Sequence, residues 1–146
     1  MKTPKVSNLS KNIFLGIATA IAIFSLSSCA KKVTFLTSSI VPAARGSVKV
    51  SKDRNKNYVI KIQLYNLAES NRLQPSKSIY VVWMAADHKT INLGKIKSST
   101  SALSNKLKAY FENVSSVKPD RIFITAEDDA NIQYPSSDVV LSTDNF

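Results

Sequence analysis

The feature that most restricts the fold of this chain is a run of alternating apolar and polar side chains between residues 58 and 64. The apolar positions recur at every second residue, at Tyr58, Ile60, Ile62 and Leu64. Lys61 and Gln63 stand between them. A period of two places successive side chains on opposite faces of a strand, whereas an amphipathic helix repeats every three to four residues. The run therefore predicts a β-strand with one face in a core and the other in solvent.

Further segments of strand length follow one another between polar, proline or glycine residues. They are Val33–Thr37, Ser47–Ser51, Ile79–Ala85, Ile91–Ile96, Arg121–Ala126 and Val139–Leu141. The alternation in Ile91–Ile96 slips at Gly94, which indicates a β-bulge. Residues 101–113 carry apolar side chains at helical spacing and also at strand spacing, so a helix and a strand both remain open there.

The segment Ile79–Ala85 is apolar on both faces. Such a strand is expected at the centre of a sheet, covered on both sides or lying under a loop. Trp83, the only tryptophan, belongs to it, and we expect this side chain in the core between two sheets. Seven or eight strands without a secure helix predict an all-β fold, an antiparallel sandwich.

The N-terminus has the three parts of a secretory signal. Basic residues come first, the apolar run Ile13–Phe24 follows, and small residues precede Cys29. The apolar run has 12 residues, whereas a membrane-spanning helix needs about 20. A cleaved signal over residues 1–28 is therefore the first interpretation. A retained anchor helix is the second, and an ordinary signal with an incidental cysteine is the third.

The residues Leu26, Ser27, Ser28 and Cys29 resemble the lipobox of bacterial lipoproteins. In that family the cysteine is acylated and becomes the new N-terminus, so the resemblance implies lipid attachment at Cys29. Residues 29–40 would then hold the lipidated end, a short tether and the first strand. Residues 41–146 would form one domain, large enough for a core. Ala30, in place of an acidic residue after the cysteine, resembles signals that permit outer-membrane delivery.

A second resemblance is to the extracytoplasmic C-terminal domain of anti-sigma-K factors. It rests on three short stretches, Tyr80–Trp83, Asn92–Gly94 and Ile124–Glu127, and covers roughly residues 41–142. That domain is an immunoglobulin-like sandwich, so the resemblance implies the same fold here. The sigma-binding region and membrane span that precede it in anti-sigma factors do not match the 28 residues before Cys29, so we expect only the outer module to be shared.

The charge is strongly uneven along the chain. Residues 31–108 hold 15 basic and 3 acidic residues, and residues 109–146 hold 2 and 7. A basic excess favours an anionic partner, and for an envelope protein this means anionic lipid or glycan, with no role for nucleic acid. The candidate contact residues are Lys49, Lys61, Lys95 and Lys97, which on outward positions of neighbouring strands would form one basic face. The alternative is that these lysines only keep the surface soluble.

Catalytic and metal-binding patterns are weak. His88 is the only histidine, no Gly-x-Ser-x-Gly motif occurs, and the chain has three glycines in all. Glu127, Asp128 and Asp129 lack the spacing of a calcium loop and are interpreted as a solvated loop. We therefore expect no catalytic residue, metal or cofactor, in a non-enzymatic envelope lipoprotein that acts as a binding, sensing or structural module. The first alternative is a small periplasmic hydrolase or metal-binding protein that uses His88. The second is a sensor subunit that docks on an envelope membrane protein, which would need an exposed apolar patch.

Overall fold

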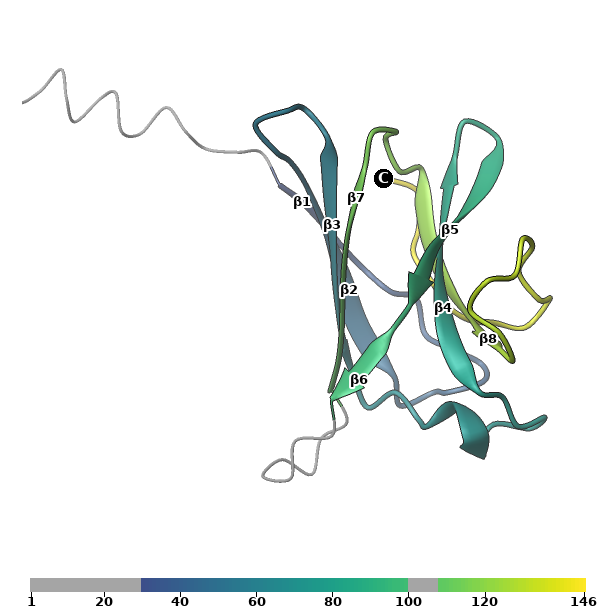
Figure 1. The fold of residues 1–146 in the computed structure, drawn as a ribbon. Coiled ribbons are helices and arrows are strands. Elements are labelled where there is room, and N and C mark those ends of the chain that lie inside the picture. Colours follow the sequence, from purple (N-terminus) through teal and green to yellow (C-terminus); the bar gives the residue numbers. More distant parts are fainter. Residues whose placement is uncertain (1–29, 100–107) are drawn as a thin grey trace, which may run out of the picture.

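The computed structural model describes residues 30–99 and 108–146 of the chain. Their strands are β1 Lys31–Thr34, β2 Arg45–Lys52, β3 Tyr58–Tyr65, β4 Ile79–Ala86, β5 Lys89–Lys95, β6 Lys97–Ser99, β7 Lys108–Ser115, β8 Arg121–Glu127 and β9 Val139–Ser142. A single 3-10 turn, η1, covers Ser70–Arg72. The strands form two antiparallel sheets that pack face to face (Figure 1). The predicted all-β sandwich is confirmed.

The strand order is β1-β2-β3-β7-β6 in the first sheet and β5-β4-β8-β9 in the second. In their order across the first sheet, β2, β3, β7 and β6 occupy the places of strands A, B, E and D of an immunoglobulin sandwich. The second sheet supplies C′, C, F and G, and β1 adds an extra edge strand. The fold is therefore an immunoglobulin-like sandwich. The short strand β6 was not predicted as an element of its own.

The main core lies between the two sheets. Ile60, Ile62 and Leu64 of β3 are fully buried there, as the alternation predicted, while Lys61 and Gln63 face outward. Opposing residues of the second sheet are Val82, Met84, Ile122, Ile124 and Leu141. Each such side chain contributes about 1.5–3 kcal/mol when removed from water, so this core supplies the stability that a chain with one cysteine cannot draw from disulfides.

The second sheet has a further buried cluster on its outer face. Val81, Trp83 and Phe123 form this cluster, and Ile132 of the loop between β8 and β9 packs over it. Trp83 is buried as predicted, but its predicted place between the sheets is wrong. Alternate residues of β4 point to opposite faces, and Val82 and Met84 take the inner one. The inner face of Ile79–Ala85 is covered by the other sheet, and its outer face is covered by the loop between β8 and β9. Both coverings considered for this strand are therefore present, one on each face.

The strand register confirms one local prediction, the bulge at Gly94, and decides part of one open alternative, the helix or strand in residues 101–113. The pairing of β4 with β5 shifts between Val82 and Trp83, opposite Gly94 and Asn92, which is the bulge expected at Gly94. Gly94 has a φ of +116°, which a residue with a Cβ rarely adopts. Within residues 101–113, the described part from Lys108 onward is strand, and the residues before it lie outside the described ranges.

Candidate functional site

The predicted signal, residues 1–28, and the acylation site Cys29 with Leu26, Ser27 and Ser28 lie outside the described residues. The structure begins at Ala30, which is exposed, and β1 follows at Lys31. The first strand is thus separated from Cys29 by one residue. No helix of the described residues is long and apolar enough to cross a membrane.

The four candidate lysines do not share one face. Lys49 and Lys61 lie directly opposite each other on β2 and β3, on the outer face of the first sheet. Lys95 belongs to β5 of the other sheet and pairs with Val81. The backbone of Lys97 pairs with β7 in the first sheet. The expectation of one continuous face was wrong because the chain crosses between sheets after Lys95, which periodicity does not reveal.

Lys61 is engaged by an acidic neighbour. Its Nζ lies 3.0 Å from Glu112 Oε1, and the Tyr110 hydroxyl donates to Glu112 Oε2 at 2.7 Å. The hydrogen bond and charge of Glu112 raise the pKa of Lys61, and the bond to Glu112 also raises the pKa of Tyr110. The donors Tyr110 and Lys61 in turn lower the pKa of Glu112. All three side chains are exposed, so the group is a local ion pair on a solvated sheet face.

His88 occupies the hairpin between β4 and β5. Asp87 and His88 both have positive φ values, 48° and 62°, as a type I′ turn requires. The backbone N–H of Asp87 donates to Asp120 Oδ2 at 3.1 Å. The side chains of Asp87 and His88 are both exposed. Among the described residues, no group of three or more His, Cys, Asp or Glu side chains is placed to hold a metal ion.

The three acidic residues at the end of β8, Glu127, Asp128 and Asp129, are not equally exposed to solvent. Glu127 is the last residue of β8 and is buried, whereas Asp128 and Asp129 are exposed. The interpretation of all three as a solvated loop was therefore wrong for Glu127. The backbone N–H of Ser136 donates to Glu127 Oε1 at 2.9 Å, and the Thr125 hydroxyl donates to the same oxygen. Asp128 pairs with Lys77 at 2.8 Å, and the hydrogen bond from Lys77 raises the pKa of that lysine.

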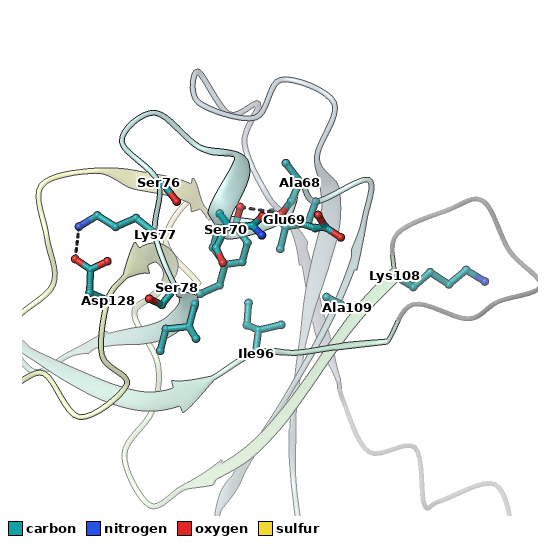
Figure 2. A pocket seen from close by; sticks show the side chains of 14 residues that line it. Ala68, Glu69, Ser70, Ser76, Lys77, Ser78, Ile96, Lys108, Ala109 and Asp128 are labelled. Carbon is teal, nitrogen blue, oxygen red and sulfur yellow. Dashed lines mark hydrogen bonds and ion pairs between the residues drawn. The ribbon is translucent and has the colours of Figure 1, made fainter.

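A cavity of about 460 Å³ opens at the end of the sandwich away from the start of β1. Four segments bound it: the β3–β4 connection with the start of β4, the β5–β6 junction, the start of β7, and Asp128 after β8. Its apolar lining consists of Leu67, Ala68, Ile79, Tyr80, Ile96 and Ala109. Figure 2 shows Ile96 and Ala109 in the middle, the Lys77–Asp128 pair on one side and Lys108 on the other. A volume of this size with an apolar wall and a polar rim is typical of small-molecule sites.

Tyr80 links the cavity wall to the loop above it. The Tyr80 hydroxyl donates to the backbone carbonyl of Ala68 at 2.9 Å, and the ring is 8% exposed. Burial raises the pKa of Tyr80 to about 12. The hydroxyl therefore stays neutral and holds the β3–β4 connection in place. Sequence reasoning did not find this cavity, because its walls come from four segments that only the strand order brings together.

Comparison of the chain with protein-family models, with curated proteins and with solved structures found no match.

Proposed function

We propose that the protein is a non-enzymatic lipoprotein of the bacterial envelope, anchored through Cys29, whose sandwich acts as a binding module. The observation that carries the proposal is the start of β1 at Lys31, two residues after the lipobox cysteine. Adjacent Cα atoms are 3.8 Å apart, so an acyl chain on Cys29 holds the first strand within about 8 Å of its attachment point. Two or three acyl chains on one residue would hold the domain at the membrane.

The start of β1 and the cavity lie at opposite ends of the sandwich. Lys31 is paired with Val50, which stands level with Ile60 in β3. Ala109, in the cavity wall, stands level with Leu64. Ile60 and Leu64 are four residue steps apart, which is about 13 Å along β3. A domain anchored at β1 would present the cavity away from the bilayer, where a small amphiphilic or apolar organic molecule can enter it.

The anchor is tested by replacing the lipobox cysteine. Cys29→Ser should abolish incorporation of labelled palmitate and release the protein from the membrane fraction after a carbonate wash. Ser28→Ala is the matched control, because it keeps a small residue before the cysteine and should leave both properties unchanged. A Cys29→Ser protein that still incorporates palmitate and stays with membranes contradicts the anchor.

The cavity is tested with anilinonaphthalene sulfonate, an amphiphilic probe whose fluorescence rises in apolar surroundings. Ala68→Phe places a ring in the cavity rim and should weaken probe binding at least tenfold. Ala43→Phe adds the same ring at an exposed position outside the lining and should have no effect. Equal binding by the two variants, with both folded by circular dichroism, contradicts the cavity as the site.

A further inference from the structure

The end of the first sheet beside the proposed anchor carries a group of basic side chains. This basic cluster consists of Lys31, Lys32, Lys52, Arg54 and Lys56. Lys31 and Lys32 open β1, and the other three belong to the end of β2 and to the hairpin that leads into β3. Figure 1 shows this hairpin rising beside the start of β1. All five side chains are exposed, and Asp53 is the only acidic residue among them.

The hairpin holds its shape without using these cations. Asp53 Oδ1 accepts the backbone N–H groups of Asn55 and Asn57 at 2.8 and 2.9 Å. Lys56 adopts a φ of +66° to close the turn. The only acidic group is thus engaged by backbone donors. Lys52 is placed over the ring of Tyr58, with its Nζ 5.2 Å from the ring centroid.

Outside the basic cluster, three cations of the described ranges make ion pairs with acidic residues there, namely Lys61, Arg72 and Lys77, whereas Lys49, Lys95 and Lys108 make none. At the cavity end, Arg72 pairs with Glu69 at 2.9 Å and Lys77 with Asp128 at 2.8 Å. In residues 30–99 and 108–146, no member of the basic cluster makes such an ion pair. At the adjoining end of the second sheet, basic and acidic residues are equal in number: Lys89, Lys118 and Arg121 with Asp87, Asp120 and Asp144. The five cations of the basic cluster therefore stand without acidic ion-pair partners among the described residues, at the end of the first sheet, next to the start of β1.

We propose that the basic cluster binds the phosphate groups of anionic phospholipids and sets the domain upright on the membrane. This inference rests on the proposed anchor at Cys29, which keeps the cluster at the level of the headgroups. Basic residues near an anionic surface are attracted by about 1 kcal/mol each, which corresponds to about fivefold in the docked population per residue. The tether makes this attraction intramolecular, so it acts on orientation even where free binding is weak.

The experiment measures docking of the mature lipoprotein in vesicles. A fluorescent amino acid at Asn55, in the hairpin, reports quenching by lipids with a nitroxide headgroup. Vesicles of phosphatidylcholine alone are compared with vesicles that contain phosphatidylglycerol. We expect strong quenching only with phosphatidylglycerol, and its loss at 0.5 M salt, because screening shortens the reach of surface charges to a few ångströms at such concentrations.

Variants that remove charge from one end of the domain or the other show which end docks on the membrane. Arg54→Gln with Lys56→Gln should lower the ratio of docked to undocked protein by about 30-fold. Arg72→Gln with Lys95→Gln removes the same charge at the cavity end and should leave the ratio unchanged. Equal quenching in both vesicle types, or equal loss in both double variants, overturns the inference.

The test separates this inference from the proposed anchor. Mass spectrometry of the same purified protein shows whether Cys29 carries acyl chains. If it does not, the anchor fails, and the mature chain is coupled to a maleimide lipid through Cys29 so that docking is still measured. An acylated protein without charge-dependent docking refutes the basic cluster alone.

Discussion

Trp83 donates its indole N–H to the hydroxyl of Thr125 at 2.8 Å, on the outer face of the second sheet. The Thr125 hydroxyl in turn donates a hydrogen bond to Glu127 Oε1, which also accepts the backbone N–H of Ser136 from the covering loop. A buried tryptophan N–H needs such a partner, since an unsatisfied buried donor is costly. The chain of hydrogen bonds therefore explains how an apolar cluster and a buried carboxyl group occupy one face together.

Thr125→Val removes the central hydroxyl of this chain while keeping the side-chain shape. It should lower the free energy of unfolding by about 1–3 kcal/mol, because the Trp83 N–H loses its acceptor in a buried site. Urea unfolding followed by Trp83 fluorescence measures the change. Thr125→Ser keeps the hydroxyl and should retain more stability than the valine variant. Equal stability of the two variants would show that the hydroxyl contributes nothing.

Asn92 fastens the loop that covers Trp83. Its Nδ2 donates to the carbonyls of Ala130 and Ile132, both at 2.9 Å, and its Oδ1 accepts the N–H of Gly94. Asn92→Ala should loosen the loop and raise the acrylamide quenching of Trp83 several-fold. Asn131→Ala changes an exposed side chain of the same loop and should leave the quenching at the wild-type level. Identical quenching in the two variants would argue against this role of Asn92.

Tyr80 makes the stability of the folded protein depend on pH in the alkaline range. Its pKa is about 12 in the folded protein and 10.0 in an exposed tyrosine, so the folded state holds the proton more tightly. The stabilising effect is complete below pH 10 and is lost as the pH rises from about 10 to 12. Ultraviolet titration at 295 nm should show a component with this late midpoint, absent in Tyr80→Phe. A Tyr80→Phe protein with an unchanged titration curve would assign the component elsewhere.

Gly46 lies where β2 passes close to β3. A Cβ added there would clash with the carbonyl oxygen of Gln63, a backbone atom that cannot move without disturbing the ladder. Gly46→Ala should therefore lower the free energy of unfolding by about 1–3 kcal/mol, as overpacking does. Ser47→Ala, one residue further, serves as the comparison and should change stability little. Thermal unfolding of the two variants provides the measurement, and an unaffected Gly46→Ala would refute the close approach.

Strand positions and faces followed from the sequence because they are local properties. The alternation in β3 identified Ile60, Ile62 and Leu64 as core, and the interruption at Gly94 identified the bulge. Successive side chains of a strand point to opposite faces, so an alternation of apolar and polar residues can be recognised without knowing the partner strand. The same reasoning failed for Trp83, since an apolar strand with two covered faces does not say which face meets the other sheet.

The sequence by itself determined that the chain forms an antiparallel sandwich and which residues of most strands face inward. Only the tertiary structure decided where distant segments meet. It placed Lys95 on the sheet opposite Lys49, buried Glu127 under the β8–β9 loop, and assembled the cavity from four separate segments. It also grouped the basic cluster beside the start of β1. These arrangements depend on strand order and loop paths, which are set by long-range packing that local periodicity does not encode.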